Sequence, residues 1–138
     1  MPEKDEPRER LAGGVMPERY KRNLGTVGLE GQQKLLQAKV VVIGAGGLGG
    51  TIIELLARLG VGYIRVVDGD CFAAHNLNRQ LLAEEHNLGG NRAEAAATRV
   101  RNINSEVIVE PHPVMLDESN AHELLAGVDI VVDALDNI

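Results

Sequence analysis

The sequence predicts an α/β fold: a doubly wound, Rossmann-like parallel sheet with helices on both faces, of which the N-terminal part with about four strands is present. Three observations support this class. Short β-branched runs alternate with helix-like segments along the chain. The first run, Val40–Ile43, is apolar at every position, which is typical of a strand covered on both faces. A glycine-rich turn follows it and opens a helical segment.

Each element follows from its local pattern. Val40–Ile43 is closed by glycines, and Gly60 stands where a helix C-cap is expected. The alanine-rich segment that starts at Arg92 has helical spacing. Strands are expected at Val40–Ile43, Tyr63–Asp68, Val107–Val109 and Ile130–Val132, and helices at Leu29–Ala38, Leu48–Leu59, Arg92–Ile103 and Asn120–Ala126. A short polar segment, 19–23, precedes the first helix.

The length of 138 residues suits one domain. Residues 1–17 mix charges with Pro and Gly and show no apolar period, so we expect a disordered N-terminal leader there and a nucleotide-binding domain over 18–138. A single Cys excludes a disulfide scaffold and fits a reducing, cytoplasmic setting. No apolar run approaches the ~20 residues of a membrane span, and the charged N-terminus does not resemble an export signal, so we expect no membrane association.

The charge balance argues against nucleic acid as a partner. Fourteen Lys and Arg stand against twenty Asp and Glu, a net charge of −6, and the chain has only two Tyr and one Phe. Nucleic-acid binding usually needs a basic face and aromatic stacking platforms, and this composition provides neither.

A glycine loop follows the first strand and fits the GxGxxG pattern. Gly44 allows the tight turn, Gly46 lets backbone approach a phosphate, and Gly49 lets helix and strand pack closely. The helix that follows offers unpaired N–H groups and a partial positive charge. Asp68 ends the second strand, where its carboxylate can accept from a ribose hydroxyl. The alternative is a glycine turn needed only for packing, with Asp68 as a solvated strand end.

A polar loop, His75–Gln80, comes after Asp70 and is not needed by a hydride-transfer domain. Asn76 can donate to phosphate oxygens, and Arg79 offers a planar, permanent cation for a transferring phosphoryl group. Alternatively, Arg79 is a surface ion-pair partner of Glu84 or Glu85.

Nine motifs occur in the order and spacing of one family. They are Arg19-Tyr20-x-Arg22, Gly28-x-Glu30-Gly31-Gln32, the glycine loop 44–49, Gly60-Val61-Gly62, Asp68-x-Asp70, Asn76-Leu77-Asn78-Arg79-Gln80, Gly89-Gly90, Ile103-Asn104 and Asp133-x-x-Asp136-Asn137. From about residue 18 to its last residue, the chain resembles the ThiF/MoeB/HesA adenylating proteins, relatives of the ubiquitin-activating enzymes.

The resemblance implies ATP-dependent adenylation of a carboxylate, usually the C-terminal Gly-Gly end of a small ubiquitin-like (β-grasp) sulfur-carrier protein, with release of pyrophosphate. It implies catalytic roles for Arg79, Asp136 and Arg22, the last reaching across a homodimer to the partner's nucleotide. Asp136 would hold Mg²⁺, a hard cation suited to one carboxylate plus phosphates and waters; ignoring the family, it can equally be a helix N-cap or loop acid. The nucleotide-binding residues implied are Gly44, Gly46, Gly47, Gly49, Asp68, Asp70, His75, Asn76, Arg79, Gln80, Arg92, Asp136 and Asn137.

The sequence also departs from the family. Arg92 stands where the family usually has Lys, which keeps the charge but changes its reach. Cys71 is not at the family's reactive position, so we expect a small buried residue there. Relatives continue for roughly another hundred residues, with CxxC zinc ligands in many members. The chain lacks CxxC pairs, so a structural zinc is not expected in it. We therefore interpret it as a truncated product or fragment, with an uncovered apolar edge near 130–135.

Two other functions stay open at this point. The glycine loop with Asp68 also fits an NAD-binding oxidoreductase domain. The early ending also fits a non-catalytic module for carrier binding or dimerisation. The residues do not identify the carboxylate or its pathway.

Overall fold

The structure, a computed structural model, describes residues 7–136. In this part of the chain a four-stranded sheet has the order β3-β2-β1-β4, and every neighbouring pair is parallel. The strands are β1 (Lys39–Ile43), β2 (Tyr63–Val67), β3 (Ile108–His112) and β4 (Ile130–Asp133). In the register, Val42 of β1 lies opposite Val66 of β2 and Val132 of β4. The predicted parallel, Rossmann-like α/β class is confirmed.

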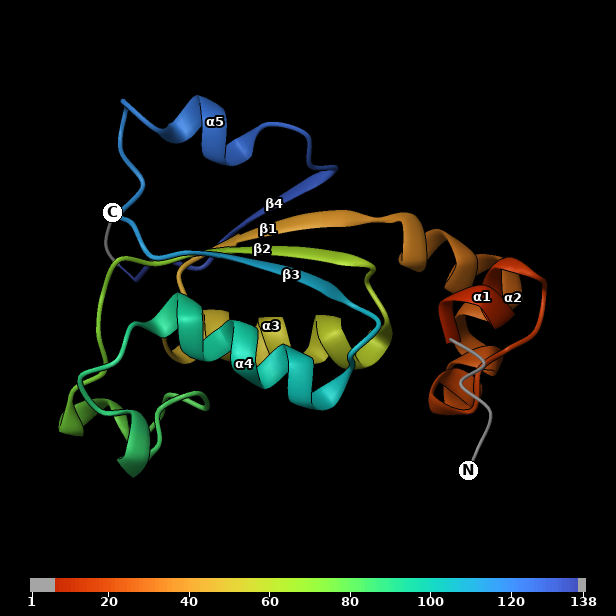
Figure 1. Cartoon of the computed structure of the whole chain (residues 1–138), viewed down its shortest axis with the longest axis horizontal. Helices are drawn as coiled ribbons and strands as arrows, with labels where there is room; N and C mark the ends of the chain where they lie inside the picture. Colours follow the sequence, from red (N-terminus) through yellow and green to blue (C-terminus); the bar gives the residue numbers. More distant parts are fainter. Residues whose placement is uncertain (1–6, 137–138) are drawn as a thin grey trace.

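Helices cover both faces of this sheet (Figure 1). α3 (Gly47–Leu59) and α4 (Arg92–Ile103) lie on one face, and the short α5 (Ala121–Leu125) lies on the other. Side chains alternate between the faces because the strand period is two. Val40 and Val42 therefore enter the larger core with α3 and α4, whereas Val41 and Ile43 pack towards Leu124 of α5.

Three further elements gather at the amino ends of the strands: α1 (Pro7–Ala12), the 3-10 turn η1 (Glu18–Asn23) and α2 (Leu24–Gln37). Buried hydrogen bonds fix η1 there, since Asn104 Nδ2 donates to Tyr20 Oη (2.7 Å) and to Ala57 O (3.0 Å). None of the helices in the described part of the chain combines the length and apolar character needed to cross a bilayer.

The disordered leader expected over residues 1–17 is wrong from residue 7 onward. α1 forms there, Leu11 is fully buried, and Gln33 Nε2 of α2 donates to Leu11 O (2.9 Å). A single apolar anchor gives no periodic signal, which is why the sequence pattern missed it. Residues 1–6 lie outside the described residues.

The expected burial of Cys71 is also wrong, because the thiol is exposed. Its neighbour Phe72 takes the buried place, at 3% exposure, on the loop between β2 and α4. Successive side chains of an extended segment point in opposite directions, so burying Phe72 turns Cys71 outward. The same loop contains two 3-10 turns, η2 (Ala74–Asn76) and η3 (Glu85–Asn87).

Candidate nucleotide-binding site

A cavity of about 580 Å³ opens at the carboxyl ends of β1, β2 and β4, which is a size suited to a small-molecule ligand. Consecutive strands run outward from β1 through β2 to β3, whereas β4 lies on the other side of β1. The cavity therefore lies where the strand order reverses, the usual ligand position in open α/β sheets. Its lining residues are Ile43, Gly44, Gly46, Gly47, Leu48, Val67, Asp68, Asp70, Arg79, Gln80, Arg92, Val114, Met115, Leu116, Ala134, Leu135 and Asp136.

The glycine loop forms one side of this cavity. Gly44 has a φ of 102°, in the left-handed region that favours glycine, and its N–H donates to Val67 O (2.8 Å). Gly49 packs against the Gly44 carbonyl oxygen so closely that a Cβ would collide with it. Gly49 does not line the cavity itself. It brings α3 against the end of β1, so that the loop stays tight and its backbone can approach a ligand.

Asp68 joins the glycine loop to the loop that follows β2. The residue is 7% exposed; Oδ2 accepts from Ala45 N (2.8 Å) and Oδ1 accepts from Asp70 N (2.8 Å). Asn91 Nδ2 also donates to the backbone oxygen of Asp68 (2.9 Å). Each carboxylate oxygen keeps a further lone pair, so the geometry leaves capacity for a ribose hydroxyl. The same side chain thus braces two loops and faces the cavity.

Two guanidinium groups reach the cavity from different elements, and they are held differently. Arg79 is exposed; its Nη1 donates to Asn78 Oδ1 (2.9 Å) and to His75 O (3.2 Å). Glu84, which the sequence suggested as an ion-pair partner of Arg79, instead has its Oε2 3.2 Å from His86 Nδ1. Arg92 begins α4, and its side chain is 16% exposed, with Nη1 at 3.4 Å from Asp70 Oδ2. Two permanent cations beside one cavity favour a phosphate-bearing ligand.

The remaining residues of the predicted 75–80 segment differ in position. Gln80 is 6% exposed, lines the cavity, and has a buried Oε1 with no hydrogen-bond partner in the described part of the chain. Arg92 Nε is likewise buried and has no hydrogen-bond partner among the described residues. Asn76 and His75 do not line the cavity: Asn76 is buried at 1% exposure, and His75 is exposed and contributes its backbone oxygen to Arg79.

The segment after the fourth strand brings an acid to the cavity. Leu135 N donates to Asp133 Oδ1 (3.1 Å), and this turn leads to Asp136, which is exposed and lines the cavity. Among residues 7–136 there is no group of three or more His, Cys, Asp or Glu that could hold a metal ion. A single carboxylate fits Mg²⁺, which is commonly held by one or two carboxylates together with substrate phosphates and waters. Asn137 lies outside the described residues.

The sequence pattern missed the apolar wall of the cavity. Val114, Met115 and Leu116 follow β3 and line it. Met115 packs on Gly69 so closely that a Cβ there would lie 2.8 Å from Met115 Cγ. The signal was an apolar run directly after a strand, at the edge where ligands bind in such sheets.

Arg22 is the one predicted catalytic residue of the described chain that lies away from the cavity. It belongs to η1, at the amino ends of the strands, whereas the cavity is at their carboxyl ends (Figure 1). Its side chain is exposed.

Fold and cavity together define the class: an α/β domain with a glycine-loop site of the nucleotide-binding type. The particular family follows from comparison with known proteins. The model of the ThiF family matches residues 20–138, and the chain belongs to that family.

Curated relatives support this assignment. The chain is 48% identical over 122 residues to the SAMP-activating enzyme E1 of Haloferax volcanii, and 44% identical over 122 residues to the sulfur carrier protein adenylyltransferase of Thermus thermophilus. Each match covers 87% of this chain and 45% of the relative. The chain therefore spans somewhat less than half the length of these two relatives.

Solved structures share the fold. The tRNA N6-threonylcarbamoyladenosine dehydratase TcdA of E. coli, in complex with ATP, has a TM-score of 0.84 and 33% identity, covering 88% of this chain and 50% of that one. E. coli MccB with ATP has a TM-score of 0.80 and 30% identity, covering 93% of this chain and 40% of that one.

Proposed function

We propose that this chain supplies the ATP-binding site of an enzyme that adenylates the C-terminal carboxylate of a ubiquitin-like sulfur-carrier protein. The observation that carries the proposal is the cavity at the strand-order reversal, where a glycine loop, Asp68 and two arginines converge. Two relatives named for activating a SAMP or a sulfur carrier protein suggest the class of substrate.

The chemistry is a substitution at the α-phosphorus of ATP. An oxygen of the carrier's carboxylate forms a bond to that phosphorus, and the bond to the bridging oxygen of the β-phosphate breaks. An acyl-adenylate and pyrophosphate result. The backbone amides of the glycine loop and the start of α3 bind the phosphates, and Asp68 accepts from the ribose. Arg79 and Arg92 stabilise the charge that develops on the transferring group and the leaving pyrophosphate.

Asp136 is the residue that would hold Mg²⁺ in this scheme. A bound Mg²⁺ supplies Lewis-acid stabilisation of phosphate charge. Asp136 follows the turn after β4 and lines the same cavity as the two arginines, so an anionic ligand and its cation can both be held there.

Arg22 is proposed to act only in a homodimer. Its position at the amino ends of the strands keeps it from the cavity of its own chain, so a contribution to catalysis requires a second subunit. A carrier ending in Gly-Gly, the dimer and a cytoplasmic location are predictions that go with this proposal.

The direct test is ATP–pyrophosphate exchange together with nucleotide binding. We expect the chain to bind ATP, and a Gly-Gly carrier to drive pyrophosphate exchange; Arg79→Ala should reduce the exchange at least about 100-fold, the scale of losing one charge-stabilising donor. Glu85→Ala, a change at an exposed residue of η3, is the matched control and should keep the activity. Binding of NADH with no binding of ATP would overturn the proposal and favour an oxidoreductase domain.

A further inference from the structure

Asn76 is buried and does not line the cavity. Its exposure is 1%, and its Oδ1 accepts from Arg92 Nη2 (3.2 Å) and from Ala73 N (2.8 Å). A residue expected to touch phosphate thus instead touches one of the two arginines that line the cavity.

Arg92 is held on several sides by its neighbours. Besides Asn76, its guanidinium contacts Asp70 Oδ2 at 3.4 Å, lies 4.0 Å from Asp68 Oδ2, and stands over the Phe72 ring at 5.8 Å from the centroid. These contacts engage Nη1 and Nη2, whereas the buried Nε has no partner in the described part of the chain. The orientation of the guanidinium is therefore set before a ligand arrives.

The position of Arg92 is unfavourable for the helix that it starts. A cation in the first turn opposes the helix dipole, which favours negative charge there. Asp68 and Asp70 offset part of that cost, but neither accounts for a guanidinium that faces the cavity. A bound anion would satisfy the guanidinium and the helix N-terminus together.

We propose that Asn76 is a positioning residue, which fixes the Arg92 guanidinium in the orientation that receives the phosphates of the nucleotide. The inference rests on the proposed ATP site. Asn76 acts on the nucleotide through Arg92. The arrangement also explains how an arginine works at this place: a planar fork needs a fixed orientation to bind phosphate well, whereas a compact ammonium does not.

The chain contains a matched control for the second contact of Asn76. Asn76 caps η2 by accepting from Ala73 N, and Asn87 caps η3 by accepting from Glu84 N at 2.9 Å. Asn87 Nδ2 donates to Leu82 O (2.8 Å), and Asn87 is outside the cavity lining. The two caps accept alike from the backbone, and of the two only Asn76 Oδ1 also accepts from an arginine.

The test measures binding of ATP and of adenosine to the full chain by calorimetry. We expect Asn76→Ala to weaken ATP binding about tenfold and to leave adenosine binding unchanged, because only the phosphates use Arg92. Asn87→Ala should leave both unchanged. Asn76→Ser is a second variant, because serine can still cap the turn but is too short to reach Arg92; it should fold and weaken ATP binding as much as Asn76→Ala.

A double-mutant cycle separates positioning from a structural role. In the Arg92→Lys background, Asn76→Ala should weaken ATP binding by less than about twofold further, because the oriented fork is already gone. Equal losses in both backgrounds, or an equal loss for adenosine, would overturn the inference while leaving the ATP site intact. If the unaltered chain binds no ATP, the proposed function fails, and the inference fails with it.

Discussion

A single hydrogen atom in place of a side chain at Gly49 shapes the glycine loop. Gly49 lies inside α3, where alanine normally stabilises a helix by about 1 kcal/mol over glycine. Here a Cβ would collide with the Gly44 carbonyl oxygen, a backbone atom that cannot turn aside, and would lie 3.3 Å from Ala134 Cβ. The collision is therefore expected to outweigh the gain in helix propensity.

We expect Gly49→Ala to lower the free energy of unfolding by about 1–3 kcal/mol, the usual cost of overpacking, and to abolish ATP binding. Urea unfolding and calorimetry measure the two effects. The control is Gly25→Ala in α2, where nothing lies within 4 Å of the added Cβ; this change should stabilise the chain by several tenths of a kcal/mol. A stabilised Gly49→Ala variant would contradict the packing role.

The sequence predicted best those site residues whose position follows directly from the order of strands and loops. Gly44, Gly46 and Asp68 lie at the cavity because a loop after a buried strand and an acid at the end of the next one meet at the same sheet edge. Asn76 could not be placed, because whether an amide faces a ligand or a neighbouring arginine depends on tertiary packing. Spacing along the chain does not reveal that choice.

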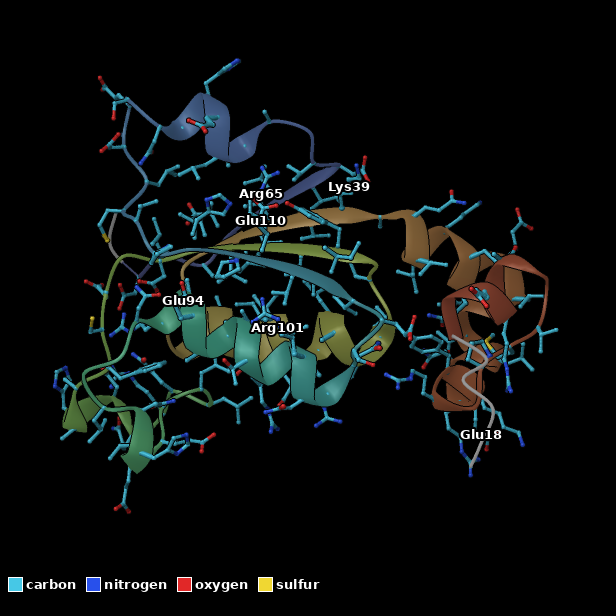
Figure 2. The ribbon with its side chains drawn as sticks, in the orientation of Figure 1. Glu18, Lys39, Arg65, Glu94, Arg101 and Glu110 are labelled. Atoms are coloured by element: carbon cyan, nitrogen blue, oxygen red, sulfur yellow. The ribbon has the colours of Figure 1, made fainter. Side chains whose placement is uncertain are left out.

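At the scale of elements, a polar network ties α5 to the sheet (Figure 2). Arg65 of β2 and Glu110 of β3 lie together on the face beneath α5. Arg65 Nη1 donates to the carbonyl oxygens of Leu124 (2.7 Å) and Ala126 (2.9 Å), at the end of that helix. Glu110 accepts from Tyr63 Oη and contacts His112 Nε2, each at 2.5 Å. The loop before α5 forms the apolar wall of the cavity, so this network also supports the site.

The hydrogen bonds from Tyr63 and then His112 lower the pKa of Glu110 below its ordinary value of 4.5. The unfolded chain therefore binds this proton at higher pH, and the carboxylate stabilises the fold above pH 4.5; that contribution is lost as pH falls through the lower folded-state pKa. We expect unfolding free energy to fall between about pH 6 and about pH 3 more steeply in the unaltered chain than in Glu110→Gln, by less than about 1 kcal/mol, because Glu110 is partly exposed to solvent.

Glu123→Gln in α5 is the control for this pH dependence, because Glu123 is exposed. Urea unfolding across the same pH range should give it the slope of the unaltered chain. Parallel curves for the unaltered chain and Glu110→Gln would show that the network is not coupled to proton binding by Glu110.

Element boundaries show where sequence patterns reach their limit. The bounds of α4 agree with the prediction, Arg92–Ile103, because Asn91 caps it by accepting from Glu94 N (3.0 Å). α2 begins at Leu24 rather than Leu29, since two helical segments join across Gly28 at a φ of 68°. β3 runs on to His112 through Pro111; β3 is an edge strand, so the missing N–H is tolerated and pairing with β2 sets its extent.

At the scale of the whole molecule, the sheet separates two regions with different expected roles. The cavity occupies the carboxyl ends of the strands, and η1 with Arg22 occupies their amino ends. The fold class followed from alternating strand and helix patterns, because a parallel sheet requires crossovers. The placement of η1 was harder to predict from the sequence, because it depends on contacts such as that between Tyr20 and Asn104, which are 84 positions apart.

Together with the proposed homodimer, this separation predicts complementation between two inactive variants. Arg22→Ala and Arg79→Ala should each reduce pyrophosphate exchange at least about 100-fold. An equimolar mixture, allowed to exchange subunits, should recover roughly a quarter of the unaltered activity, because half of the dimers are mixed and each of these has one complete site. Mixing either variant with itself is the control. No recovery, with subunit exchange shown by mass spectrometry, would place the action of Arg22 outside the partner's site.

Cys71 gives the molecule a practical handle. It is the single cysteine of the sequence, its thiol is exposed, and its neighbour Asp70 lines the cavity. A maleimide dye would attach to one defined atom without any prior mutagenesis. Fluorescence from that dye would report the arrival of a ligand at the rim, so binding could be followed in real time.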